Sequence, residues 1–310
     1  LYLKKEIKII NRWTKMGIAS ILINYNDEEN TKKLVKKLEK FSSISKIVVV
    51  DNCSNKKNCF EKLKLLQNSK VTVIRADKNG GYNYGINYGI HFLECKNERY
   101  EILMCSNTDI DISEEAIDIC INELKKENNI AVVAPKMLNK EKKQIRRCSW
   151  KIRTFARDIV HSTRLLEILF YKRLRNGEYS RQDFEKDRLE VEAISGACFF
   201  IKYEVVKKID YFDDNVFLFY EEDILGTKLK VLNYKTYSLN NISFIHYESQ
   251  TIGKTINYFK KMKQLFKSKI YYQRRYNHIN LLQVLCFYIL WFFRCIELLI
   301  EVPIRKIMKK

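Results

Sequence analysis

Two carboxylates separated by one residue, Asp109 and Asp111, follow an apolar run that ends at Ser106. Carboxylates at this spacing can lie on the same side of an extended turn and share one hard cation, such as Mg²⁺ or Mn²⁺, whose other positions are filled by water and phosphate oxygens. Asp111 could instead help Ser113 to cap the helix expected to begin near Glu114. The segment predicts a metal site of the kind that binds nucleotides, centred on Asp109.

Three consecutive acids, Glu221, Glu222 and Asp223, stand between an aromatic run and an apolar helix start. A carboxylate beside aromatic surface is partly desolvated in its charged form, which suits it to act as a general base. The same acids could only complement the dipole at the helix N-terminus, each contributing a few tenths of a kcal/mol. Both roles are compatible if one acid reacts and the others stabilise the helix.

The densest glycine cluster of this glycine-poor chain lies between Asn79 and Gly89, a segment that holds four of the nine glycines. Glycines let the backbone approach a ligand, or let a helix pack closely on a strand. The spacing fits neither the G-x-x-x-x-G-K-[ST] loop of ATPases nor a G-x-G-x-x-G dinucleotide turn. Ligand contact and close helix packing both stay open for this segment.

Two further segments carry residues suited to a site. Ser195, Gly196 and Ala197 lead into an apolar strand, so small residues stand where that strand begins. His246 directly follows the apolar run Ile242–Ile245 and could ligate a metal or a diphosphate oxygen, although a single histidine is more often structural.

The elements that must position these residues alternate between short β-branched runs and helical stretches. Strand, helix, strand at this spacing predicts βαβ units and a mostly parallel sheet. Such sheets bind ligands outside the carboxyl ends of their strands. The expected strands end in polar residues at Asn24, Asp51, Arg75 and Asn107; they are Ile18–Asn24, Lys46–Asp51, Val71–Arg75, Glu101–Ser106 and Ala131–Pro135, the last preceded by a helix over Glu114–Lys125.

The composition is that of a folded chain: of 310 residues, 46% are apolar and 30% charged. Its nine cysteines include no C-x-x-C pair, which predicts free thiols in a reducing compartment and argues against a disulfide framework or a zinc site. Residues 1–16 are basic and lack the apolar segment of a secretory signal, so a cytoplasmic location is expected.

The net charge of +20 is concentrated at the two ends of the chain, with +4 on residues 1–16 and +11 on residues 254–310. A nucleic-acid enzyme more often spreads its basic residues over the working face. Basic segments near a membrane gain about 1 kcal/mol per residue from the surface potential. The charge therefore favours anionic lipid over nucleic acid as the partner; solvated charge that only keeps the chain soluble is the alternative.

In order along residues 17–250, these segments resemble the inverting family 2 glycosyltransferases, especially the bacterial rhamnosyltransferase-like branch. Two positions depart from the family pattern: Asn83-Tyr84 replaces an A-G pair, and Ile224 stands where the family has its second acid. The motifs that carry the resemblance are Asn24-Tyr25-Asn26, Val50-Asp51-Asn52-Cys53-Ser54, Asn79 through Gly89, Ser106-Asn107-Thr108-Asp109, Ser195-Gly196-Ala197 through Ile201, Glu221-Glu222-Asp223-Ile224-Leu225, and His246.

The resemblance implies an α/β, Rossmann-like GT-A fold with a mostly parallel central sheet and helices on both faces. It implies a glycosyltransferase domain over 17–253, with a donor half of about 17–135 and an acceptor half of about 136–253. Residues 1–16 would be a basic extension and 254–310 a basic, aromatic helical tail. The implied site residues are Asn24, Asn26, Asp51, Asn79, Gly81, Gly85, Asn87 and Asn107 for the donor, Ser195, Gly196 and Ala197 for the sugar and acceptor pocket, and Asp109, Asp111 and His246 for Mg²⁺ or Mn²⁺.

The implied chemistry is one in-line displacement at the anomeric carbon of a UDP- or dTDP-linked sugar, with inversion and no covalent intermediate. The acceptor would be a glycan or a polyprenyl-linked glycan of cell-surface polysaccharide synthesis. Aligning Leu225 on the family leucine makes Glu222 the base that takes the acceptor proton. A shift by one residue would make Asp223 the base instead, and Glu221 ranks third.

The tail contains an uninterrupted apolar run, residues 284–293, bounded by Gln283, Arg294 and Glu297. Ten residues rise only about 15 Å as a helix, half the hydrocarbon thickness of a bilayer. With basic residues on both sides, an interfacial amphipathic helix on the inner face of the cell membrane is expected. The alternatives are packing on the enzyme or on a second copy, which would make a homodimer, and a true span.

Other function classes account for the sequence less well. A nucleotidyltransferase normally carries a basic glycine-rich signature near its first strand, whereas Asn24–Thr31 is acidic. A non-catalytic sugar- or lipid-binding module would follow if the departures at Asn83-Tyr84 and Ile224 were disabling. An RNA-binding protein lacks support because no aromatic strand pattern of that kind occurs.

Overall fold

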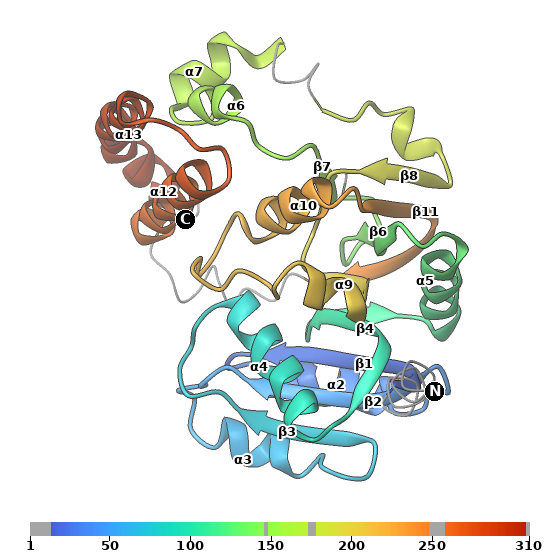
Figure 1. The fold of residues 1–310 in the computed structure, drawn as a ribbon. Helices are drawn as coiled ribbons and strands as arrows, with labels where there is room; N and C mark the ends of the chain where they lie inside the picture. The colour runs from blue at the N-terminus through green and yellow to red at the C-terminus, as the bar shows by residue number, and fades with distance from the viewer. Residues whose placement is uncertain (1–13, 146–147, 173–177, 248–257, 308–310) are drawn as a thin grey trace, which may run out of the picture.

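The computed structural model describes residues 14–145, 148–172, 178–247 and 258–307, and its central element is a nine-stranded sheet with helices on both faces (Figure 1). The first half of this sheet is parallel, in the order β3-β2-β1-β4. The predicted strands of this half are confirmed. The apolar runs of β1, β2 and β4 are buried on both faces, whereas β3 at the edge of the sheet fully buries only alternate residues. The strands are β1 (Thr14–Asn24), β2 (Ile44–Asp51), β3 (Val71–Arg75) and β4 (Arg99–Asn107), connected by α2 (Glu28–Leu38), α3 (Cys59–Lys64) and α4 (Tyr82–Cys95).

The second half of the sheet is mixed, which corrects the expectation of a mostly parallel sheet beyond β4. Strand β10 (Cys198–Lys202) lies antiparallel between β4 and β6 (Ile130–Leu138). Strand β11 (Lys235–His246) runs parallel to β6 and antiparallel to β5 (Ile110–Ile112) and β8 (Arg188–Val191). The antiparallel strands follow from long excursions of the chain, which no local sequence pattern records.

Helices and a small sheet complete the unit. Helix α5 (Glu114–Lys126) begins at Ser113, whose side chain accepts a hydrogen bond from the backbone of Ala116 at 3.2 Å, so Ser113 and not Asp111 is the capping residue. All nine cysteines are free thiols, as expected, although Cys286 is only half-buried. The other elements are β7 (Ser149–Trp150) paired with β9 (Ala193–Ile194), α6 (Phe155–Val160), α7 (Arg164–Leu169), η2 (Asp183–Glu185), α9 (Tyr203–Lys208) and α10 (Glu221–Val231).

The tail folds as a helical hairpin at one end of the molecule, made of α12 (Tyr258–Arg275) and α13 (Leu281–Ile307) (Figure 1). Tyr272 of α12 is fully buried, lies 5.3 Å from the Tyr220 ring centroid to centroid, and shares a 3.0 Å hydrogen bond with Thr227 of α10. Ser268 donates to the backbone oxygen of Leu218 at 2.7 Å. Helix α12 is thus packed on the segment that leads into the three acids at 221–223.

Helix α13 is longer than its apolar run of ten residues predicted. Its 27 residues continue past Arg294, because this guanidinium pairs with Glu297 at 2.7 Å and Glu301 at 2.9 Å on the same helix. The stretch Leu281–Glu301 has a mean hydropathy of 1.8 and is long and apolar enough to cross a membrane by those two measures alone. The expected apolar helix of only about 15 Å, too short to cross a bilayer, is therefore wrong.

We expect Tyr272→Ala to lower the free energy of unfolding by about 3–5 kcal/mol, because it removes a fully buried ring that α10 and Tyr220 enclose. Tyr272→Phe should cost about 1 kcal/mol, the value of the hydrogen bond with Thr227. The exposed Lys267→Ala on the same helix is the control. Urea unfolding measures all three, and equal stability of Tyr272→Ala and Lys267→Ala would show that α12 is not part of the folded unit.

Candidate active site

Asp109 and His246 meet at the edge of the sheet where β4 ends. Because β11 pairs antiparallel with β5, its last residue lies opposite Ile110, and His246 Nε2 comes within 3.3 Å of Asp109 Oδ1. The backbone N–H of Tyr247 donates to the backbone carbonyl oxygen of Asp109 at 2.9 Å, which fixes the turn. Strand pairing therefore brings together two residues that are 137 positions apart in the chain.

This pair fits a divalent cation that takes its remaining ligands from a substrate. One carboxylate and one imidazole suit Mn²⁺, and Mg²⁺ is commonly bound by one or two carboxylates plus phosphates and water. Across the described residues, no three His, Cys, Asp or Glu side chains converge on a common point. Asp111 pairs with Lys37 on α2 instead of joining Asp109, so its role as a ligand stays a prediction that this ion pair does not favour.

Glu222 is the acid of the 221–223 triplet that contacts the loop at 195–197. Its side chain is half-buried at the start of α10, and Oε1 accepts a hydrogen bond from the backbone N–H of Gly196 at 3.1 Å. Burial raises the pKa of Glu222, against the opposing effects of this hydrogen bond and the charge of Arg153. A desolvated carboxylate held by one donor is a stronger base than an exposed one.

Asp223 is occupied by structural contacts. Its carboxylate accepts hydrogen bonds from the Trp150 indole at 3.3 Å and the Arg153 backbone N–H at 2.9 Å, and the Arg153 side-chain Nε lies 3.8 Å away. Burial raises its pKa to about 7, although Arg153 opposes the shift. Burial and the neighbouring Glu222 raise the pKa of Glu221 as well. This arrangement favours Glu222 over Asp223 as the base.

One loop connects Glu222 to the end of β4. Strand β10 enters the sheet beside β4 with Cys198 opposite Ser106, and the backbone N–H of Asn107 donates to the Ala197 oxygen at 3.0 Å. Gly196, the next residue, donates to Glu222. The predicted pocket residues 195–197 thus lie between the Asp109 segment and the acid triplet, and the two halves of the site share one edge of the sheet.

The backbone before the triplet is strained. Phe219 and Tyr220 both have a φ of 70°, a left-handed conformation that bulky residues rarely adopt. Gly81 holds this loop from the other side: a Cβ on Gly81 would lie 2.3 Å from the backbone oxygen of Phe217, so only glycine fits. Tyr82 donates its hydroxyl to the Gly196 oxygen at 2.6 Å. The glycine cluster therefore contacts both loops of the site.

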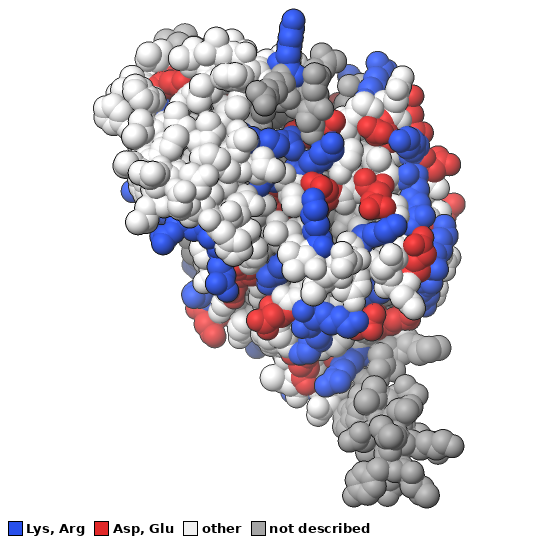
Figure 2. All heavy atoms as spheres, turned by 45° about the horizontal axis from the view of Figure 1, so that its top comes forward, with Lys and Arg blue, Asp and Glu red and all other residues white. Residues whose placement is uncertain are grey.

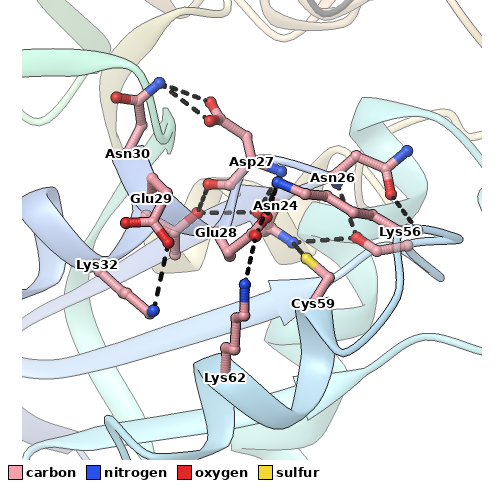
Figure 3. Close-up of polar contacts among 12 residues, drawn as sticks. Asn24, Asn26, Asp27, Glu28, Glu29, Asn30, Lys32, Lys56, Cys59 and Lys62 are labelled. Atoms are coloured by element: carbon pink, nitrogen blue, oxygen red, sulfur yellow. Dashed lines mark hydrogen bonds and ion pairs between the residues drawn. The ribbon is translucent and has the colours of Figure 1, made fainter.

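Asn24 and Asp51, predicted to bind the donor, form a buried network at the ends of β1 and β2; Figure 3 shows Asn24 among the polar residues that follow β1. The Asn24 amide donates to Asp51 Oδ1 at 2.8 Å and to Ser54 Oγ at 3.2 Å, and its oxygen accepts from Thr31 at 2.9 Å. Neither Asn24 nor Asp51 is exposed. Their donor role stays a prediction. Arg75, at the end of the neighbouring strand β3, is exposed, and its Nε lies 3.8 Å from Asp51 Oδ2.

The remaining predicted donor residues also make structural contacts. Asn26 has a φ of 59° and its side-chain oxygen caps the backbone of Asn55 and Lys56 at 3.0 and 2.9 Å. Asn87 is buried and bonds both backbone groups of Phe212. Three others lie in similar settings: Asn79 accepts from the Asn52 amide, Gly85 packs on Ile23, and Asn107 is half-buried at the end of β4.

The sequence did not single out Trp150, Arg153 or Tyr82, which contact the acids or the loop that holds them. Trp150 ends a short basic and aromatic stretch, residues 146–150, and that composition is the one local signal for it. No local pattern marks Arg153, because its partners Asp158 and Asp223 are separated by 65 positions.

Comparison with known proteins identifies the family. Residues 20–210, more than half of the chain, match the model of Glycosyl transferase family 2. The chain is 26% identical over 205 residues to "Low-salt glycan biosynthesis hexosyltransferase Agl10" of Haloferax volcanii. That match covers 66% of this chain and 59% of the relative, so the chain spans less than two thirds of that relative's length.

Solved structures show the same fold at low sequence identity. GalNAc-T7 with UDP, GalNAc and Mn²⁺ has a TM-score of 0.58 at 13% identity, covering 86% of this chain and 52% of its own. TarS of S. aureus with UDP-GlcNAc has a TM-score of 0.56 at 15% identity, covering 84% and 67%. The mannosyltransferase PcManGT of Pyrobaculum calidifontis with GDP-Man and Mn²⁺ has a TM-score of 0.51 at 12% identity, covering 85% and 70%. With an α/β fold shared with these structures and a family match over most of its sheet, this chain belongs to glycosyl transferase family 2.

Proposed function

We propose that this protein is a metal-dependent, inverting glycosyltransferase that uses a nucleoside-diphosphate sugar, UDP- or dTDP-linked. The observation that carries the proposal is the loop at 195–197, which contacts both Asn107 and Glu222 and so puts Asp109 and a raised-pKa carboxylate at one edge of the sheet. The hexosyltransferase relative supports transfer of a hexosyl or rhamnosyl group.

On the donor side, Asp109 and His246 would hold Mg²⁺ or Mn²⁺ together with the diphosphate. The metal supplies Lewis-acid stabilisation of the negative charge that develops on the departing nucleoside diphosphate. Mn²⁺ in the structures of GalNAc-T7 and PcManGT supports this assignment. UDP, UDP-GlcNAc and GDP-Man in the three neighbours support a nucleotide-sugar donor.

On the acceptor side, Glu222 takes the proton of the attacking hydroxyl. The Gly196 N–H holds Oε1, which leaves Oε2 to accept that proton. The acceptor oxygen attacks the anomeric carbon opposite the leaving group, so a single displacement inverts its configuration. Trp150 and Arg153 fix Asp223 and thereby the first turn of α10.

The acceptor would be a glycan or a polyprenyl-linked glycan of cell-surface polysaccharide synthesis. A location on the inner face of the cell membrane accompanies this proposal, with the basic tail facing anionic lipid. The support is the long apolar helix α13 and the +11 charge of residues 254–310. A homodimer through the tail is the alternative use of the same surface.

We expect Glu222→Gln to reduce transfer by about 10²–10⁴-fold while UDP binding is retained, because the amide cannot accept the proton. Asp223→Asn should reduce transfer less, since this carboxylate positions α10 through Trp150 and Arg153. Steady-state transfer from a radiolabelled UDP-sugar and calorimetric UDP binding measure both effects. Normal transfer by Glu222→Gln together with an inactive Asp223→Asn would move the base to Asp223.

We expect Asp109→Ala to abolish Mn²⁺-dependent binding of UDP, because it removes the carboxylate that faces His246. His246→Ala should weaken the same binding by about 10–100-fold. Titration of UDP binding with Mn²⁺ measures the loss. Asp111→Ala tests whether Asp111 is also a metal ligand. An unchanged Mn²⁺ requirement would exclude Asp111 as a ligand. A loss equal to that of Asp109→Ala would show that the ion pair between Asp111 and Lys37 opens when metal binds.

We expect the acid limb of the pH profile of kcat/KM to lie above the usual glutamate pKa. Glu222 must be ionised to act as a base, and burial raises its pKa, so activity falls as the pH drops through that raised value. Arg153→Gln should move the limb to still higher pH, since Arg153 lowers this pKa. Rates from about pH 5 to about pH 9, with UDP binding measured at each pH, test the assignment; an acid limb near the unperturbed value would contradict it.

A further inference from the structure

A second cavity lies outside the active site, between the α6–α7 turn and the helical hairpin. Its volume is about 740 Å³, and both polar and aromatic side chains line it. The stacked rings of Phe266 and Trp291, 4.7 Å apart, form one wall. His161, Ser162, Arg164 and Lys269 are among the polar lining residues. Neither the donor site nor the catalytic base uses this cavity.

Lys269 is the unusual residue of this cavity, because it is a buried ammonium held by uncharged oxygens. It is 5% exposed, and Nζ donates to the Asp158 backbone oxygen at 3.2 Å and to Ser162 Oγ at 3.1 Å. The carboxylates of Asp158 and Glu167 act on it only through their charge, since they pair with Arg153 and with His161 and Arg164. Burial lowers its pKa to about 8, which still leaves the amine mostly charged at neutral pH. Burying a charge costs free energy unless an opposite charge faces it, so a bound anion would stabilise Lys269 in its charged form.

The carboxylates of the cavity are already balanced by other cations. Glu167 lies 3.1 Å from both Arg164 and His161, and Glu301 lies 2.9 Å from Arg294. Arg294 is also shared with Glu297, at 2.7 Å. Lys269 is therefore the lining cation whose nitrogen has only uncharged oxygens as hydrogen-bond partners among the described residues, whereas Arg164, 62% exposed, already faces Glu167.

Apolar side chains surround this cavity on the outside of the molecule. Figure 2 shows a broad, mostly uncharged area at the upper left, where α13 lies in Figure 1, with an acidic group near its upper edge and Lys and Arg at its lower edge. Contiguous apolar surface of this extent marks an interaction site with lipid or protein. The exposed large apolar residues of α7 and α13 include Leu165, Ile168 and Leu169 on α7 and Leu285, Tyr288, Ile289, Phe292, Phe293, Ile296, Leu299 and Ile300 on α13.

We propose that this cavity binds the phosphate group of a polyprenyl-linked acceptor, with the prenyl chain along the exposed apolar side chains of α7 and α13. A lipid phosphate would place its negative charge at Lys269 and its hydrocarbon chain on the apolar surface. A free anion would use only Lys269, and a neutral lipid would use only the apolar surface. This inference rests on the proposed transfer to a lipid-linked acceptor and names the site that would hold its phosphate.

A network of polar contacts connects Lys269 of the cavity to the acid triplet. Asp158, whose backbone binds Lys269, receives the Gln273 amide at 2.6 Å and the Arg153 guanidinium at 3.4 Å. Arg153 in turn contacts Asp223, next to the base. A phosphate held at Lys269 would therefore sit against the network that positions the acid triplet.

Three compounds, each titrated into the full chain by calorimetry, distinguish the contributions of the phosphate and of the prenyl chain. They are farnesyl phosphate, which has both, farnesol, which has only the chain, and inorganic phosphate. We expect farnesyl phosphate to bind at least about tenfold more tightly than either of the others. Equal binding of farnesol would leave only an apolar lipid surface, and equal binding of inorganic phosphate would make the ligand a free anion. Either result overturns the proposal.

Lys269→Met keeps the length of the side chain, removes its charge, and should weaken farnesyl phosphate binding at least about tenfold with little effect on farnesol. Met262→Trp fills the cavity without removing a polar contact and should weaken farnesyl phosphate binding to a similar extent. Lys267→Ala, on the exposed face of α12, is the matched control and should leave this binding unchanged. Melting temperatures check that each variant folds. Wild-type affinity in folded Lys269→Met or Met262→Trp would place the lipid elsewhere.

Failure of the proposed function is distinguishable from failure of this site. If the wild type neither binds UDP nor hydrolyses a UDP-sugar with Mn²⁺, the glycosyltransferase proposal fails, whatever the lipid titrations show. If UDP binds and farnesyl phosphate does not, the catalytic proposal stands and the cavity has no lipid-phosphate role.

Discussion

The site depends on one constraint, the insertion of β10 beside β4 in the antiparallel direction. This pairing puts the loop at 195–197 at the carboxyl edge of the parallel strands, where the Asn107 N–H binds Ala197 and the Gly196 N–H binds Glu222. A parallel β10 would place that loop at the opposite edge of the sheet. Asp109 and His246 on one side and Glu222 on the other come from distant parts of the chain, and this strand sets their relative position.

The buried acids require compensation from their surroundings. Burying carboxylates costs free energy unless donors or cations face them. Arg153 supplies most of this compensation, since it contacts Asp158 and Asp223 and lies over the Tyr220 ring at 5.5 Å. The left-handed backbone at Phe219 and Tyr220 is held by Gly81 on one side and by α12 on the other. The strain is stored where an active site needs a fixed geometry.

The sequence predicted the parallel half of the sheet and the polar ends of its strands, because runs such as 46–51 are buried on both faces and are apolar throughout. It also predicted that Asp109 and His246 belong to one site, which the structure places 3.3 Å apart. It did not predict the antiparallel β10 or the contacts of Arg153, since both depend on residues far apart in the chain. The sequence also could not predict that the side chains of Asn24 and Asn87 are engaged in hydrogen bonds within the protein. A buried structural asparagine and a ligand-binding asparagine can have the same neighbours in the sequence.

Helix α12 links the catalytic unit to the apolar surface through the ordinary spacing of a helix. Residues 268 and 272, four apart, face the loop before the acids and bind Leu218, Tyr220 and Thr227. Residues 262, 266 and 269, also three or four apart, face the second cavity and α13. One helix thus presents one side to the base-bearing segment and the other to the hairpin partner. Because α12 packs on α10 and on the loop before it, the tail is part of the folded unit that carries Glu222.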